Sequence, residues 1–478
     1  MRAFPLFARN SVSYGLANAG CRVPDDLTAM ETDGLDFRRV TALLDAVDAG
    51  DVGRIAGLME PLHAADIADL LEQIGGPDRR ALLALWSVGI DGDVLSEIDD
   101  AIREEVIEAL PASVVRDAMR ELDSDDIVDI LEDLDAPEQG VILEGLDVAD
   151  RVAVQAALAF PEGSAGRLMQ REVVVAPDHW TVGEAIDFLR ETPVLPDQFY
   201  HVILVDPRMK PVGYVTLGRV LSSARSVRLD AVLEDSFRTV EATADEADVA
   251  YIFNQYHLIS CPVVDAGGRL VGVITIDDAM NVLDEEHEED MLRLAGVADD
   301  SSLSDGAFET AKARLPWLVV NLFTASLSAL VITAFEGTIS TLVALAALMP
   351  IVASTGGIAG TQSLAVAVRA LATRSLTSAN ARRVVARELG AGLLNGLGLA
   401  AILGSGGFLV FGDPLLGVVL GMAMIANQVV AALGGVLVPL TMSRLGMDPA
   451  LASGTFVTTL TDVMGFFAFL GLATLVLI

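Results

Sequence analysis

Five apolar segments near the C-terminal end constrain the fold of this chain more than any other feature. A helix that crosses a bilayer needs roughly 20 consecutive, mostly apolar residues. Segments of that length or longer cover residues 315–335, 338–368, 385–411, 415–442 and 453–478. We therefore predict an α-helical, polytopic membrane domain with five transmembrane helices over residues 315–478.

The last apolar segment carries a single carboxylate, Asp462. An ionised aspartate near the centre of an isolated membrane helix costs about 2.5 to 3.5 kcal/mol on insertion scales, so it should face protein or water. At helical spacing Gly454, Thr458, Asp462 and Gly465 share one face, which a second helix or a hydrated ion could approach. Asp462 is thus a candidate ion-binding residue. The alternative is a buried, hydrogen-bonded acid that holds helices together.

Charge separates the membrane domain from the rest of the chain. Of the 67 acidic and 31 basic residues, five and six lie from Leu315 onward, so the preceding part carries about 37 net negative charges. Such a surface repels nucleic acid and anionic lipid headgroups and attracts cations, especially if dimerisation brings two copies together. We expect no nucleic-acid partner.

Basic residues near the apolar segments predict the orientation in the membrane. Lys312 and Arg314 precede the first segment, five arginines lie in and beside the second connection, and Arg444 lies in the fourth. The positive-inside rule then places the N-terminus in the cytoplasm and the C-terminus outside. The two cysteines, Cys21 and Cys261, provide no disulfide framework, in agreement with a cytoplasmic soluble part. Residues 1–35 lack the apolar core of a signal peptide, and we expect a disordered tail there.

Residues 36–165 contain short amphipathic helices separated by Asp, Pro and Gly. A loose unit of a leucine, a capping residue and an apolar helical face begins at Leu62, Leu110 and Leu122. This repetition predicts an all-α superhelical N domain over 36–165. The alternative is a set of amphipathic helices without true repetition.

Strands and helices alternate twice between residues 166 and 283. The second copy has a strand at Cys261-Pro-Val-Val-Asp265, a glycine turn at 266–268 and a further strand ending in Gly-Val-Ile-Thr. In the first copy, residues 207–210 replace that glycine turn. The order resembles a tandem pair of cystathionine β-synthase (CBS) modules, 166–228 and 229–283, which are α/β regulatory sensors of a nucleotide or an ion.

An acidic run at 284–290 follows the CBS pair, near the start of a predicted connecting helix over 284–314. Carboxylates at i, i+3 and i+4 lie on one helical face and repel one another unless a cation sits among them. The alternative is a solvated face with no binding role.

The second apolar segment contains Pro350 and the glycine-rich stretch 354–362. These residues permit a kinked or locally opened helix that lines a cavity. No Lys-Ser/Thr pair follows the glycines as in a phosphate-binding loop, and there is no His-Glu-x-x-His motif. With no recognisable nucleophile, base or metal cluster in the soluble part, we do not expect an enzyme.

Taken together, residues 160–169, the CBS pair, residues 350–362 and residues 448–462 resemble the MgtE family of magnesium channels, from about residue 36 to the C-terminus. The resemblance implies a homodimer with a pore between the second and fifth helices, where Asp462 faces hydrated Mg²⁺. The other expected pore positions are Thr458 and Gly454, on the helical face of Asp462, and Gly356 and Gly357 of the second segment. The sequence departs from the family's pattern at Ile358, where a Gly-Gly-Asn motif is common, and at Gly454, where a polar residue sometimes occurs. Acids that correspond by position to the family's magnesium sensors are Asp245, Asp278, Glu286, Glu289 and Asp290.

The expected function is therefore uptake of Mg²⁺ across the cytoplasmic (inner) membrane, closed by cytoplasmic Mg²⁺ that binds the acidic N-domain, CBS and connecting-helix region. ATP is a further candidate ligand, at the CBS pair, and membrane lipid is an expected partner. An alternative is a CBS-regulated transporter of Co²⁺, Ni²⁺ or another solute.

Overall fold

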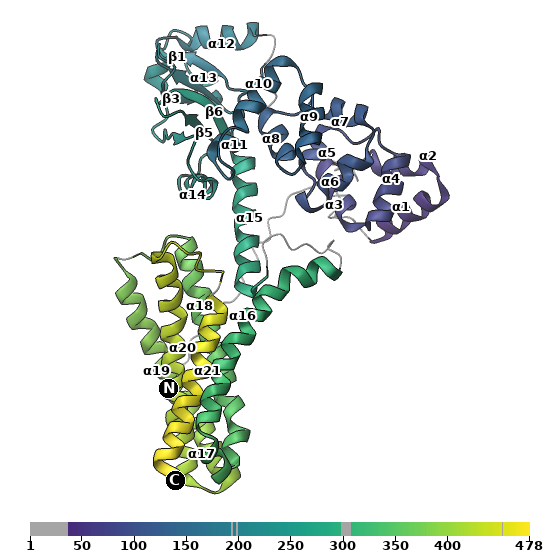
Figure 1. Ribbon diagram of the computed structural model, residues 1–478. Helices are drawn as coiled ribbons and strands as arrows, with labels where there is room; N and C mark the ends of the chain where they lie inside the picture. The colour runs from purple at the N-terminus through teal and green to yellow at the C-terminus, as the bar shows by residue number, and fades with distance from the viewer. Residues whose placement is uncertain (1–36, 193–194, 197–198, 298–306, 378, 452) are drawn as a thin grey trace, which may run out of the picture.

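The computed structural model describes residues 37–192, 195–196, 199–297, 307–377, 379–451 and 453–478. A helical N domain and a CBS pair with two small sheets lie at one end, and a bundle of long helices lies at the other (Figure 1). The predicted fold class is confirmed in these three parts. The predicted disordered tail, residues 1–35, lies outside the described residues.

Short helices build the N domain, as predicted. Helix α3 begins directly after Leu62-His63, α7 after Leu110-Pro111 and α8 after Leu122-Asp123, so the recurring unit marks helix starts. The helices of the domain are α1 (Phe37–Ala49), α2 (Val52–Met59), α3 (Ala64–Gln73), α4 (Gly76–Leu85), α5 (Gly92–Ser96), α6 (Asp100–Ala109), α7 (Ala112–Ala118), α8 (Ser124–Glu132), α9 (Ala136–Gly145) and α10 (Val148–Ala157). The short α11 (Ala165–Leu168) leads into the CBS pair.

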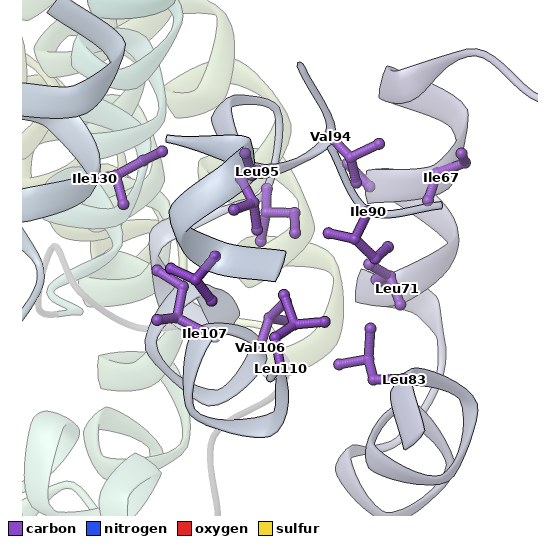
Figure 2. Close-up of a cluster of buried hydrophobic side chains, with 14 of the residues drawn as sticks. Ile67, Leu71, Leu83, Ile90, Val94, Leu95, Val106, Ile107, Leu110 and Ile130 are labelled. Atoms are coloured by element: carbon purple, nitrogen blue, oxygen red, sulfur yellow. The ribbon is translucent and has the colours of Figure 1, made fainter. Parts of the chain in front are cut away.

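Aliphatic side chains from successive helices form the continuous core of the N domain (Figure 2). Leu71 of α3 and Leu95 of α5 are fully buried in it, and Val106 of α6 and Ile130 of α8 extend it along the domain. Because each short helix buries one face against its neighbours, the stack holds together through this shared core.

Each CBS module contains a three-stranded sheet with the same topology. In the first, β1 (Val175–Pro177) pairs parallel to β2 (His201–Val205), which pairs antiparallel to β3 (Pro211–Thr216). In the second, β4 (Val240–Glu241), β5 (Ser260–Val264) and β6 (Leu270–Thr275) repeat this order. Helices α12 (Val182–Glu191) and α14 (Glu246–Tyr256) provide the crossovers, and α13 (Leu217–Ser222) follows β3.

The turn between the last two strands of each module differs in sequence between the modules but has the same geometry in both. Met209 adopts a left-handed conformation, φ 61°, where the second module uses Gly268, φ 74°. In each turn one aspartate, Asp206 or Asp265, accepts two backbone N–H bonds at 2.8 to 2.9 Å. These carboxylate contacts hold the turn, so Met209 can occupy a conformation that usually favours glycine.

Helix α15 (Ile276–Ala295) runs from β6 toward the membrane helices (Figure 1). Because it begins at Ile276, the acidic run 284–290 lies in the middle of this helix and not near its start. The N-terminal end of α15 is held by a capping box in which Thr275 Oγ1 donates to Asp278 at 2.5 Å.

Five helices are long and apolar enough to span a membrane, as predicted. They are α16 (Ala307–Ala334), α18 (Ala344–Ala372), α19 (Ala381–Phe411), α20 (Pro414–Arg444) and α21 (Ser453–Leu477). The predicted start of the second span, residue 338, is wrong because a separate short helix, α17 (Glu336–Thr341), occupies that position. Helix α18 is continuous across Pro350 and the glycines, so the locally opened segment is not found.

A core substitution tests the N-domain packing. We expect Leu71→Ala to destabilise the domain by about 2–5 kcal/mol, because it removes buried methyl groups and leaves a cavity. Pulse proteolysis of the full-length protein in urea should show a midpoint for N-domain cleavage lower by about 1–2 M. Val88→Ala is the control, because Val88 is 92% exposed. An unchanged midpoint for Leu71→Ala would contradict this packing.

Candidate functional site: a membrane cavity and an acidic interface

Helices α18 and α21 line a broad, open cavity of about 480 Å³ in the membrane domain. Helix α21 contributes Thr458 and Asp462, at adjacent turns of one face. From α18 come Pro350, Ala353, Ser354, Gly357, Ile358 and Thr361. The second and fifth spans thus lie beside one cavity at Asp462 within a protomer.

Asp462 faces this cavity, and its carboxylate receives no hydrogen bond or ion pair from the residues that the structure describes. The neighbouring Thr461 is fully buried, whereas Asp462 is half-buried. This arrangement does not support the alternative in which Asp462 binds another helix through hydrogen bonds within the protomer. A carboxylate with free lone pairs in a wide cavity can accept hydrogen bonds from the water shell of a cation.

The predicted glycines have different positions. Gly357 lines the cavity, and a Cβ atom built there would lie 3.9 Å from Thr458 Cγ2 across it. Gly356 and Gly465 instead face Asn427 of α20, and Gly454 lies beside the Leu294 carbonyl of α15. In this protomer, therefore, neither Gly356 nor Gly454 lines the cavity at Asp462.

An acidic interface, formed by helix α8, the start of α14 and helix α15, lies in the soluble part. Burial and the charge of Asp278 raise the pKa of Asp126 to about 7. Burial and the charges of Asp100 and Asp129 raise the pKa of Glu285 to about 7. Burial also raises the pKa of Glu246 to about 7, together with the charges of Glu132 and Asp245. These carboxylates repel one another across the domain boundary.

The predicted sensor acids belong to this interface or extend it toward the membrane. Asp245 is the N-cap residue of α14, and Asp278 caps α15 with a pKa raised to about 6 by burial and by Asp277. Burial and the charge of Glu289 raise the pKa of Glu286, and burial and Asp448 raise that of Asp290. Over the described ranges, however, no three His, Cys, Asp or Glu side chains are close enough together to hold a metal ion.

Sequence analysis missed the N-domain side of this interface. The sequence pattern places Asp125, Asp126 and Asp129 only in an amphipathic helix that follows Leu122. Glu285 lies in the acidic run 284–290 but is not among the predicted sensor acids, and Glu246 carries no signal in the sequence. The available signal was the density of acids in Asp123-Ser-Asp-Asp126. Their role depends on α8 facing α15, which the sequence does not reveal.

Two arginines form ion pairs between the soluble part and the membrane domain in the part of the chain that the structure describes. Arg293 of α15 pairs with Glu289 at 2.7 Å and with Asp448, just before α21, at 3.1 Å. Arg374, after the end of α18, pairs with Asp248 of α14, and its guanidinium lies 4.2 Å from the centre of the Tyr251 ring. The acidic interface is thus linked to both helices that line the cavity.

The raised pKa values predict a pH dependence of docking between the N domain and α15. A raised pKa means that the docked arrangement binds protons more tightly than the separated one. In the absence of divalent cations, docking should strengthen as the pH falls from 8 through about 7 to 5.5. Asp126→Asn with Glu246→Gln should reduce this dependence, because two of the three groups with a pKa of about 7 are lost and only Glu285 remains.

The measurement is a spin-label distance distribution in the full chain, with labels at Val88→Cys and Leu221→Cys in a Cys21→Ser background. Both labelled positions are exposed, and Cys261 is buried. Asp45→Asn serves as the control, because Asp45 is an exposed residue of α1. A docked fraction that is constant or rises with pH would contradict the interface.

Comparisons with known proteins match every part of the chain described above. Residues 349–472 match the family of divalent cation transporters named MgtE. Residues 62–163 match the MgtE intracellular N domain, and residues 165–226 and 230–285 match the CBS domain.

Curated relatives match nearly the whole chain. The magnesium transporter MgtE of Thermus thermophilus is 32% identical over 448 residues, covering 93% of this chain and 99% of the relative. The magnesium transporter MgtE of Bacillus subtilis is 27% identical over 445 residues, covering 93% and 98%. Among solved structures, the cytosolic domain of the Mg²⁺ channel MgtE in complex with ATP is similar, with 28% identity and a TM-score of 0.47. That match covers 51% of this chain and 99% of the solved chain. From the agreement of the three domain matches with the full-length relatives, the chain belongs to the MgtE family of magnesium transporters.

Proposed function

We propose that this protein conducts Mg²⁺ across the cytoplasmic membrane through the cavity at Asp462. The observation that carries the proposal is a carboxylate in a wide cavity between two membrane helices, without a protein partner in the described residues. Mg²⁺ prefers octahedral oxygen coordination and gives up its waters reluctantly. Six waters of about 30 Å³ each occupy about 180 Å³, well within the cavity of about 480 Å³.

The chemistry of the lining favours a hydrated cation over an anion. None of the residues that line the cavity is basic, and Asp462 carries the one charge among them. A Co²⁺ or Ni²⁺ transporter is the second candidate, because a hydrated-ion cavity distinguishes such ions weakly. Since the family is one of transporters, the function assigned is transport and not catalysis.

The open side of the cavity fits a homodimer in which a second copy completes the pore. A two-fold axis beside α18 and α21 would bring two Asp462 carboxylates to one path, with lipid around the remaining helices. The basic residues at the ends of the spans favour a cytoplasmic N-terminus and an outer C-terminus. ATP binding at the CBS pair is part of the proposal and derives from the family resemblance.

The acidic interface would close this pore when cytoplasmic Mg²⁺ is high. Repulsion among its carboxylates opposes docking, and a bound divalent cation offsets that repulsion. The contacts of Arg293 with Asp448 and of Arg374 with Asp248 supply a route from the docked interface to α21 and α18. The result is negative feedback on uptake.

Replacing the pore carboxylate tests the conduction path. Asp462→Ala should reduce Mg²⁺ uptake into proteoliposomes by at least about tenfold per assembled protein, since a loss of 1.4 kcal/mol already gives that factor. Glu336→Gln is the matched control, because Glu336 is an exposed acid outside the cavity. Equal flux in Asp462→Ala and wild type would remove the proposed path.

Neutralising the acids of α15 tests the sensor. The triple change Glu286→Gln, Glu289→Gln and Asp290→Asn should conduct at internal Mg²⁺ concentrations that close the wild type, because the cation loses its preferred binding to the closed state. Patch recordings across a series of internal Mg²⁺ concentrations measure this shift.

The matched control removes the same number of charges from exposed positions on α1 and at the end of α2: Asp45→Asn, Asp48→Asn and Glu60→Gln. This control should keep wild-type inhibition. Unchanged inhibition in the α15 triple variant would show that the acidic run is a solvated face with no binding role.

A further inference from the structure

Helix α20 places two amide side chains, Asn427 and Gln428, inside the membrane domain, where they are 0% and 2% exposed. Helix α20 is also the most deeply buried of the five spans. Burying an amide in apolar surroundings is unfavourable unless it forms hydrogen bonds. The hydrogen bonds of these two amides therefore indicate why α20 carries polar side chains at these positions.

Both amides donate to the backbone of α18. Asn427 Nδ2 donates to the Val352 carbonyl at 2.8 Å, and Gln428 Nε2 donates to the Thr355 carbonyl at 3.2 Å. The same turn of α18 contributes Ala353 and Ser354 to the cavity. The position of one cavity wall is thus tied to α20 through these hydrogen bonds.

Asn427 also separates α18 from α21, because both helices present a glycine to it. A Cβ atom at Gly356 would lie 2.1 Å from Asn427 Nδ2, and one at Gly465 would lie 2.9 Å from the same atom. Distances under 3.0 Å are essentially never seen for a real Cβ atom. Gly356 directly precedes the cavity-lining Gly357, and Gly465 lies one turn after Asp462.

The amide has a cost that packing alone does not explain. Asn427 Oδ1 is buried and accepts no hydrogen bond from the protein groups that the structure describes. A leucine, whose side chain has the same branched arrangement of four heavy atoms, would occupy the slot without burying an unpaired oxygen. Stability alone therefore favours an apolar residue here.

We infer that Asn427 is a positioning residue for ion passage, which sets the separation of α18 and α21 at Asp462 without touching the ion. The inference rests on the proposed function, because it concerns the same cavity. Changes at Asn427 should alter the half-saturating Mg²⁺ concentration and the ratio of Mg²⁺ to Co²⁺ flux. A purely stabilising residue would alter the amount of assembled protein and leave both quantities unchanged.

A double-variant cycle with Gly356 tests this contact. Gly356→Ala forces α18 and Asn427 apart, and Asn427→Ala removes the spacer and its hydrogen bond. Each should change the Mg²⁺ to Co²⁺ flux ratio in proteoliposomes by about tenfold per assembled protein. In the double variant the methyl added at position 356 fits into the space that the Asn427 side chain leaves. The change in flux ratio should therefore be clearly smaller than the product of the changes in the two single variants.

Two further variants keep the test decisive. Asn427→Leu keeps a branched side chain of four heavy atoms and removes the donor, so the protein that assembles should still show a shifted flux ratio. Gly404→Ala is the control, since its methyl would press on the Gly417 carbonyl of α20, 2.9 Å away and well before Asn427 in the chain, and Gly404 lies on α19, which does not line the cavity. It should lower stability and leave the flux ratio unchanged.

The outcomes separate this inference from the proposed function. Wild-type protein without Mg²⁺ flux, or flux that is indifferent to Asp462→Ala, would overturn the function itself. Asp462-dependent flux with an unchanged half-saturating concentration and flux ratio in Asn427→Leu would overturn the positioning role alone. If the changes in flux ratio caused by Gly356→Ala and Asn427→Ala simply multiply in the double variant, the proposed contact between these two residues is contradicted.

Discussion

A carboxylate in the middle of a membrane-spanning helix has to face water, protein or a cation, because lipid cannot solvate it. Asp462 meets this requirement by opening onto the cavity between α18 and α21. The rest of the membrane domain follows from that placement. Small residues of α18 leave space in front of the carboxylate, and α20 holds the wall in place from behind through Asn427 and Gln428.

The protein uses carboxylates in two opposite ways. Asp462 is alone in a wide, neutral cavity, which suits a hydrated ion that must leave again. The acids of α8, α14 and α15 are crowded and partly buried, so their mutual repulsion opposes docking, and we propose that protons or cations offset it. The ion pairs of Arg293 and Arg374 connect these crowded acids to α21 and α18, the two helices that line the cavity at Asp462.

Sequence reasoning predicted the architecture because its signals are local. Span length, strand alternation and the Asp462 carboxylate are each readable within one segment, and Thr458 follows from its helical spacing to Asp462. Which neighbour each residue meets could not be read in this way. Gly356 contacts Asn427 instead of the cavity, and Asp126 gains its role only because α8 faces α15. Asn427 itself was visible as a polar residue in an apolar run, but its meaning depends on the two glycines opposite it.

The most direct test of the account asks whether the cavity between α18 and α21 is the path of the ion. Ser354 lines that cavity and is exposed to it, whereas Ser405 is an exposed serine of α19 outside it. In a Cys21→Ser background, Ser354→Cys and Ser405→Cys would each be labelled to completion with a cationic thiol reagent before Mg²⁺ flux is measured. If the ion passes through the cavity, labelling should block flux at residue 354 and spare it at residue 405. Undiminished flux through fully labelled Ser354→Cys protein would contradict this path.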